Sequence, residues 1–533
     1  MLSAAAAKIL GALFKIPLTN LLGGVGMGYF GCAYGLFLPI YAISATGLSA
    51  AVAKLTSEEA AAGNWKNVRR IRSTSRLIFA LFGTVLTIII ILLSKPFAIH
   101  TTGDTSSWYA ILMIAPSALL GCMSAVERGY YEGLQNMYPT AISQAAEAVV
   151  KVICGLWLSG IVLSHEEEVL LFFPKGTDIL SVAAAAAVLG ITLSTAAGLF
   201  YCFIRNIFGD GIRASDLKNK TAQSHKSIAK RLILTMLPIT LGSVGATLTS
   251  VIDLCTVMRC IGYSQEHRLN ELIERFGSIA AESAFPAFVY GAFTGMALTV
   301  FNLVPSVTNM FGRSVMPCAA RAFVNGRKDI LKEQVCSVML AAGLIAVPAG
   351  AGLMITAQPI MFTLYSGHSE EAVIAADALA ALAPGMVCLC LVTPLFSIMQ
   401  VIGRADLPVK LMLWGVGVKL IGNILLVPNP SFAVTGAGIS TSICYELMLV
   451  LGVISLRREL GRGFGIVKAM LPVLYASLLS STAAYLLRSL LERYGAFIQL
   501  AGCIAGAVFI YVLSLKLMGK SGESIGQKLS LRI

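Results

Sequence analysis

Long apolar stretches are the feature that most constrains how this chain folds. Fourteen of them are close to the roughly 20 residues that a helix needs to cross a lipid bilayer. They lie at 2–22, 29–53, 77–99, 107–126, 138–162, 179–204, 232–258, 286–309, 335–357, 372–400, 408–427, 433–456, 467–487 and 496–515. Helices of this length satisfy their own backbone hydrogen bonds in lipid. The sequence therefore predicts an all-α polytopic membrane protein with about 14 transmembrane helices.

The composition agrees with a membrane protein and argues against several other classes. Hydrophobic residues make up 57% of the chain and charged residues 13%, which excludes a soluble globule. The net charge of +13 calls for no nucleic-acid partner, because the basic connections lack the interleaved aromatic residues of such surfaces. We expect these charges to favour the anionic inner leaflet of membrane lipids. The 12 cysteines lie mostly inside apolar stretches and are expected to be packing residues.

Lys and Arg residues are divided very unequally between alternate connections. Of the 40 in the chain, 29 lie in one set, which includes 54–76, 205–231 and the tail from Lys516, and 7 lie in the other set. The basic set faces the cytoplasm according to the positive-inside rule. We therefore expect both termini to be cytoplasmic and the segment 259–285 to lie outside.

The chain contains signs of a tandem repeat. Three landmarks recur at an offset between 267 and 269 residues: Lys54 with Arg321, Pro139 with Pro408, and Lys151 with Lys419. This offset maps stretches one to six onto stretches seven to twelve and leaves the last two as extra C-terminal helices. Repeats with an even number of helices insert in the same orientation, with the substrate path between them.

The repeat predicts how the chain divides into parts. We expect an N-terminal lobe at 1–206 and a basic cytoplasmic linker at 207–230. A C-terminal lobe is expected at 231–456, followed by the last two helices and a cytoplasmic tail at 457–533.

Four lysines inside the apolar stretches are the strongest indication of function: Lys8, Lys15, Lys151 and Lys419. A lysine at the middle of a bilayer costs about 3 kcal/mol, so it usually lines a polar cavity or has a partner. Lys8 and Lys15 are seven residues apart and share nearly the same helix face, although either one alone could snorkel to the membrane interface. Together the four lysines predict a central cavity for a negatively charged substrate.

The stretch from Pro139 carries a polar stripe with two charges. Glu147 and Lys151 are four residues apart, in the order that favours attraction on one helix face. One interpretation is a self-neutralised pair that joins helices. The other is a cavity wall whose lysine contacts an anionic head group. Lys419 favours the second interpretation, because its own stretch offers no carboxylate.

Three further charged residues are candidates for the same cavity. Asp253 could neutralise Lys8 or Lys15, or it could bind a coupling cation, and the sequence leaves both open. Arg259 is a further basic residue that we expect to bind the substrate. Glu446 is a second carboxylate that could balance charge or couple an ion, along with Glu147.

Enzymatic chemistry finds little support in the sequence. The five histidines lie in connections or at the ends of stretches, with no pair at metal-ligand spacing. No phosphate-binding loop of the P-loop type is present, so we expect no enzyme, no metal and no organic cofactor. Energy is then expected from an ion gradient (H⁺, Na⁺ or Cl⁻), from the membrane potential or from a downhill substrate.

Several stretches together resemble a known family. The first runs Lys8-Ile-Leu-Gly-Ala-Leu-Phe-Lys15, a second runs Glu127-Arg-Gly-Tyr-Tyr-Glu-Gly133 and continues to Gln144, and a third runs Gln400-Val-Ile-Gly-Arg404. The chain resembles, over essentially its whole length, the stage V sporulation protein B-like branch of the polysaccharide biosynthesis (oligosaccharide flippase) family. That family belongs to the multidrug/oligosaccharidyl-lipid/polysaccharide exporter superfamily.

The resemblance implies a fourteen-helix, two-lobed, alternating-access fold. It implies a flippase that moves an undecaprenyl-pyrophosphate-linked sugar precursor, such as lipid II, across a bacterial plasma membrane. It also implies a cavity position for Lys8 and a lipid-linked glycan substrate. Cell-wall or polysaccharide synthesis enzymes are further candidate partners, and we expect a monomer. The rivals are a cation-coupled multidrug (MATE-like) antiporter and a membrane scaffold that transports nothing.

Overall fold

The structure is a computed structural model, and it describes residues 2–102, 105–207, 223–404, 406–461 and 466–520. Every regular element in these ranges is a helix, and none is a strand. The chain forms two compact units. Unit 1 comprises Met1–Gly262 and Ala281–Gly291, and unit 2 comprises Tyr263–Ala280 and Ala292–Ile533.

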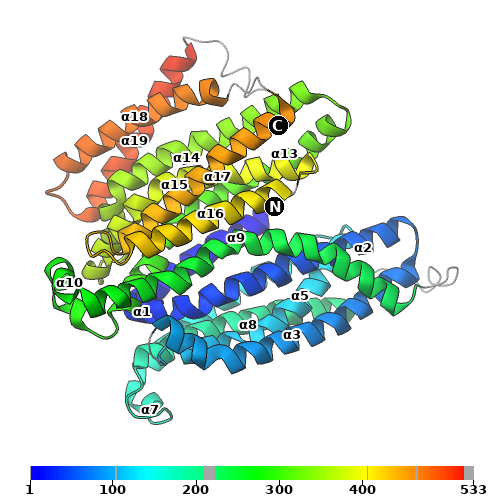
Figure 1. Ribbon diagram of the computed structural model, residues 1–533, viewed down its shortest axis with the longest axis horizontal. Coiled ribbons are helices and arrows are strands. Elements are labelled where there is room, and N and C mark those ends of the chain that lie inside the picture. Colours follow the sequence, from blue (N-terminus) through cyan, green and yellow to red (C-terminus); the bar gives the residue numbers. More distant parts are fainter. Residues whose placement is uncertain (1, 103–104, 208–222, 405, 462–465, 521–533) are drawn as a thin grey trace. The chain divides into compact units, whose positions relative to one another are not determined.

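The helices of unit 1 are mostly long and pack side by side (Figure 1). They are α1 (Leu2–Tyr41), α2 (Ser49–Ala61), α3 (Trp65–Thr102), α4 (Trp108–Ile114), α5 (Pro116–Gly133), α6 (Tyr138–Ser164), α7 (Glu166–Leu170), α8 (Ile179–Ile207), most of α9 (His225–His267) and α11 (Phe285–Gly291). A π-helical segment at Ala42–Leu48 joins α1 to α2.

Unit 2 contains the remaining α-helices. They are α10 (Leu269–Phe276), α12 (Leu298–Phe301), α13 (Leu303–Val324), α14 (Lys328–Leu364), α15 (Ser369–Val401), α16 (Asp406–Leu426), α17 (Val434–Leu460), α18 (Ile466–Leu490) and α19 (Ala496–Lys520). Helices α14, α15 and α17 form the centre of this unit, while α18 and α19 pack on each other and on α14.

The predicted all-α membrane protein is confirmed. Twelve segments of the described chain are long and apolar enough to span a membrane. One of them, Phe14–Ala61, contains the end of the first predicted stretch and the whole of the second. Eleven others match predicted stretches one to one, and the stretch at 232–258 falls within α9, where the side chains of 238–239 and 241–246 lie outside the described part. The count of about 14 is therefore approximate.

Helix α1 is two helices joined by a sharp break. Gly23 has φ 63° and ψ −172°, a conformation that favours glycine because it has no Cβ. The break folds the second part back toward the first, since Phe14 and Phe30 make an edge-to-face contact with ring centroids 6.4 Å apart. This turn lies between the two stretches predicted at 2–22 and 29–53.

Several helices begin earlier or end later than the apolar stretches predict. Helix α3 has 38 residues and starts at Trp65, so the basic residues of the predicted connection 54–76 lie largely on helices. Helix α5 continues to Gly133, whereas the apolar stretch ends at 126. The prediction that Arg128 lies in a connection between helices is therefore wrong, because α5 continues beyond the point where the hydrophobicity of its sequence falls.

The first turns of α9 pack within unit 1. Ile228 and Leu232 join a buried cluster with residues of α2, α3 and α5. The predicted repeat assigns α9 to the second lobe, whereas its contacts place most of it in unit 1. The predicted linker 207–230 lies largely outside the described residues. The repeat itself stays a prediction.

Candidate functional site

Two of the predicted lysines meet at one aromatic ring in unit 1. The Lys15 Nζ lies 4.8 Å from the centroid of the Tyr34 ring, and the Lys151 Nζ lies 5.0 Å from the same centroid. Lys15 and Tyr34 come from the two halves of α1, and Lys151 comes from α6. The break at Gly23 is what brings the first two together. Both lysines are half-buried. We call Lys15, Tyr34, Lys151 and Phe14 the lysine–aromatic cluster.

Phe14 supplies a second aromatic surface for Lys151. The Lys151 Nζ lies 5.1 Å from the centroid of the Phe14 ring, which is 1% exposed. Gly155 makes room for this ring, since a Cβ at Gly155 would lie 2.8 Å from it. An aromatic face attracts an ammonium group by about 0.5–2 kcal/mol without cancelling its charge. The cluster therefore holds two cations while leaving them able to bind an anion.

The carboxylate of Glu147 is paired with an arginine from another helix. Glu147 Oε1 lies 2.7 Å from Nη2 of Arg128 on α5, and the two side chains are 15% and 5% exposed. Arg128 also donates two hydrogen bonds to the hydroxyl of Ser143 on α6, at 3.1 and 2.7 Å. The ion pair to Arg128 weakens the interpretation of Glu147 and Lys151 as a self-neutralised pair.

Arg128 was missed among the candidate site residues. Its neighbour Glu127 shows how strongly this part of α5 is held in place. Glu127 is 0% exposed and forms ion pairs with Arg72 and Arg76 of α3. Asn206 of α8 donates a hydrogen bond of 3.0 Å to the same carboxylate. The signal that could have identified both residues is that Glu127 and Arg128 directly follow an apolar stretch. A transmembrane helix can continue through such a charged pair.

The other predicted site residues lie apart from these contacts or outside the described part. The side chain of Lys8 lies outside the described residues. Arg259 is exposed about two turns before the end of α9, where its Nη1 lies 3.0 Å from Nε2 of His100. Asp253 is 3% exposed on the same helix.

In unit 2, the two predicted residues differ in burial. Lys419 is 2% exposed on α16, and Asn423, one turn later, is 0% exposed. Glu446 is exposed on α17. Among the described residues, no group of three or more His, Cys, Asp or Glu side chains could hold a metal ion.

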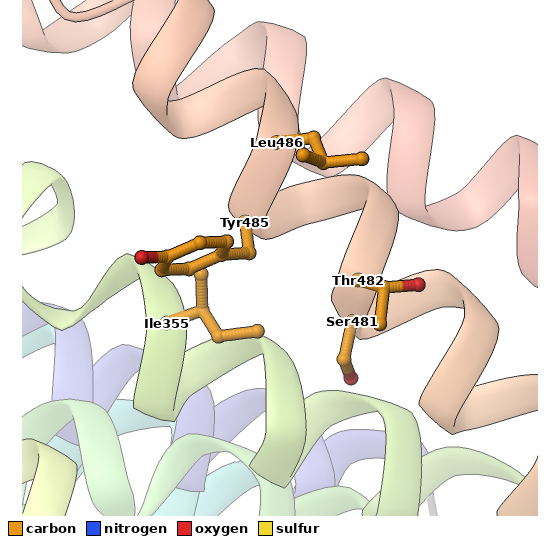
Figure 2. A pocket seen from close by; sticks show the side chains of 5 residues that line it. All are labelled: Ile355, Ser481, Thr482, Tyr485 and Leu486. Carbon is orange, nitrogen blue, oxygen red and sulfur yellow. The ribbon is translucent and has the colours of Figure 1, made fainter.

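Unit 2 also contains an apolar cleft between α14 and α18. It has a volume of about 360 Å³ and is lined by Ile355, Ser481, Thr482, Tyr485 and Leu486. Figure 2 shows Ile355 on α14 beside the ring of Tyr485, with the other three side chains on α18. None of the predicted site residues lines it.

A backbone contact near this cleft fastens α18 to α14. Pro359 has no N–H, so it cannot donate to the carbonyl of Ile355 four residues earlier in α14. Arg488 of α18 supplies that donor instead, with a hydrogen bond of 2.7 Å from Nη1 to the Ile355 carbonyl. Its Nη2 donates to the Gln358 side chain at 2.8 Å.

Comparison with known families decides the assignment. A family model described as "Polysaccharide biosynthesis protein" matches residues 1–323, more than half of the chain. The chain belongs to the polysaccharide biosynthesis protein family. A second model, "Lipid II flippase MurJ", matches residues 268–505 of this family member. The family predicted from the sequence is thus confirmed.

Two curated relatives from Bacillus subtilis (strain 168) match almost the whole chain. The lipid II flippase MurJ is 23% identical over 529 residues, covering 95% of this chain and 92% of the relative. Stage V sporulation protein B is 23% identical over 516 residues, with the same coverage of both chains. These similarities agree with a multi-pass membrane protein.

Solved structures show the same fold. A structure of the lipid II flippase MurJ in an inward closed conformation has a TM-score of 0.67 at 14% identity and covers 98% of this chain and 99% of that one. An inward-facing multidrug resistance MATE family transporter has a TM-score of 0.64 at 13% identity, covering 85% of this chain and 94% of that one. At these identities the likeness concerns the fold alone.

Proposed function

We propose that this protein is a flippase that moves an undecaprenyl-pyrophosphate-linked sugar precursor across the bacterial plasma membrane. The family and the names of the curated relatives support a lipid-linked glycan as the substrate. The substrate site is exposed alternately to the two sides of the membrane. The protein carries out no chemical step of its own, and an ion gradient or the membrane potential supplies the energy.

The lysine–aromatic cluster is the observation that carries this proposal. The ammonium groups of Lys15 and Lys151 lie 4.8 and 5.0 Å from the centroid of the Tyr34 ring. The carboxylate of Glu147, on the same helix as Lys151, is paired with Arg128. Phosphate oxygens accept charge-assisted hydrogen bonds from ammonium groups, which are stronger than neutral ones. When the substrate binds, the ammonium groups of Lys15 and Lys151 move partly away from the ring faces and bind the pyrophosphate. The prenyl chain stays in an apolar environment such as membrane lipid.

A flipping assay with purified protein in phosphatidylcholine vesicles, with imposed H⁺, Na⁺ and Cl⁻ gradients and a membrane potential, tests this function. We expect fluorescent lipid II, or an undecaprenyl-linked teichoic-acid or capsule precursor, to cross the membrane only when the protein is present. The precursor that crosses fastest identifies the glycan. If none of the three crosses faster than in empty vesicles, the proposed function is wrong.

We further propose that both termini are cytoplasmic and that the protein acts as a monomer. The excess of Lys and Arg in alternate connections supports this orientation. Lys66 and Asn270 are both exposed and provide the test. In a cysteine-free background, an impermeant thiol reagent added to intact cells should label Asn270→Cys and spare Lys66→Cys. The reverse pattern would overturn the orientation.

A further inference from the structure

The ion pair between Arg128 and Glu147 lies one helical turn from Lys151, and the function proposed above does not say what Arg128 contributes to it. We propose that Arg128 is a positioning residue that engages the Glu147 carboxylate and so preserves the charge of Lys151 for the substrate. The inference rests on the proposed function, because it assumes an anionic substrate at the lysine–aromatic cluster.

The pair is built into the packing of three helices. Arg128 on α5 contacts Glu147 at 2.7 Å and Ser143 at 2.7 Å, and both partners are on α6. The Ser143 hydroxyl donates a hydrogen bond of 2.9 Å to the carbonyl of Gly198 on α8. A Cβ at Gly198 would lie 2.7 Å from Glu147 Oε1 and 2.9 Å from Arg128 Nη2. The backbone of α8 therefore covers the pair, and only glycine leaves room for it.

Without Arg128, the nearest cation on α6 is Lys151. A glutamate four residues before a lysine attracts it along the helix face, and the attraction is stronger where water is scarce. Glu147 would then draw the ammonium group from the rings of Phe14 and Tyr34 and cancel its charge. Arg128 suits the opposing role, because its guanidinium is always charged and offers several donors in one plane. It can hold Glu147 and Ser143 at once.

The test compares Arg128→Gln with the double variant Arg128→Gln/Glu147→Gln. The measurement is the initial rate of lipid II flipping in phosphatidylcholine vesicles against lipid II concentration. We expect Arg128→Gln to raise the apparent KM about tenfold, the effect of one charge-assisted hydrogen bond. The double variant should return to within about threefold of the wild-type KM, because no carboxylate remains to compete for Lys151.

A purely structural role predicts no recovery in the double variant. If the pair only holds α5 to α6, the double variant loses the same contact as Arg128→Gln and is no more active. That result, or an unchanged KM in Arg128→Gln, would overturn the inference. Arg128→Lys serves if the glutamine variant does not fold. It loses the planar set of donors but keeps the positive charge that engages Glu147, and since the proposal requires that charge, we expect its KM within about threefold of wild type. A tenfold rise in folded Arg128→Lys would count against the proposal.

The same assay separates failure of this inference from failure of the proposed function. Lys151→Ala tests the function, because it removes the cation that binds the anion. If Lys151→Ala flips lipid II at the wild-type rate, the proposed function fails. If Lys151→Ala is inactive while the double variant is no better than Arg128→Gln, only the role of Arg128 fails.

Discussion

Lys151 in unit 1 and Lys419 in unit 2 occupy matching positions in the predicted repeat, but their surroundings differ. Lys151 is half-buried against two aromatic rings, and a glutamate paired with Arg128 lies one turn before it. Lys419 is 2% exposed, and Gly415 stands one turn before it. The comparison teaches that matching lysines need not have matching roles. Unit 1 holds its lysine where an anion can compete with aromatic rings, whereas unit 2 encloses its lysine almost completely.

The largest expected effect is loss of transport on removal of Lys151. Lys151→Ala should lower the rate of lipid II flipping on the order of 100-fold, because a charge-assisted hydrogen bond to phosphate contributes up to about 3 kcal/mol. Its thermal stability should change little, since the lost ring contacts of a half-buried ammonium are worth about 1 kcal/mol. Lys410→Ala is the matched control, because Lys410 is exposed on α16 and pairs with Asp406. Full flipping activity of Lys151→Ala would remove the distinction between the two lysines.

Lys419 should affect the stability of the protein more than Lys151 does. Lys419→Ala removes a side chain that is 2% exposed, and truncation of a buried side chain of this length costs about 2–5 kcal/mol. We expect the melting temperature in detergent to fall clearly below that of Lys151→Ala. Lys419→Met keeps the volume and should recover much of that loss. Equal melting temperatures for Lys151→Ala and Lys419→Ala would show that the difference in burial has no energetic consequence.

A glutamate one turn before the lysine, as at Glu147 in unit 1, should not be tolerated at Gly415 in unit 2. A Cβ at Gly415 would lie 2.9 Å from Cγ of Met448 and 3.1 Å from Sγ of Cys444, both on α17. Gly415→Ala should therefore separate α16 from α17 slightly and destabilise unit 2 by about 1–3 kcal/mol. Gly415→Glu should cost more, because it also buries a charge. Gly417→Ala is the control, since a Cβ there meets no atom within 4 Å. The thermal stability of the three purified variants measures the effect.

The smallest expected effect concerns drug export and Asp253. A cation-coupled multidrug antiporter would need a carboxylate in place of the lysines, and Asp253 is buried on α9. We expect cells that express the protein to export ethidium no faster than control cells, with or without Asp253→Asn. Export that requires Asp253 but not Lys151 would replace the flippase with the antiporter and make the comparison of the two lysines irrelevant to transport.

The sequence predicted the helices well because apolar length and loop charge are local signals. The two stretches before and after Gly23 were predicted separately, and the structure places the break of α1 between them. The meeting of Lys15 and Lys151 at one ring could not be predicted, since it depends on how α1 folds back and how α6 packs on it. Tyr34 carried no signal of its own among the many aromatic residues of an apolar chain.

The partner of Glu147 shows the limit of reasoning along one helix. The spacing of four residues favoured Lys151 as the partner. The structure instead pairs Glu147 with Arg128, 19 residues earlier on α5. Arg128 was assigned to a connection because hydrophobicity falls at Glu127. Contacts between helices depend on their packing, which a pattern within one helix does not contain.

The hydrogen bond from Arg488 to the carbonyl of Ile355 bears on how the C-terminal helices evolve. A chain shortened after α17 would expose to lipid a carbonyl that Pro359 leaves without its helical donor. Relatives that lack α18 and α19 are therefore expected to carry, in place of Pro359, a residue with a backbone N–H. We therefore expect the proline and the arginine to change together among relatives.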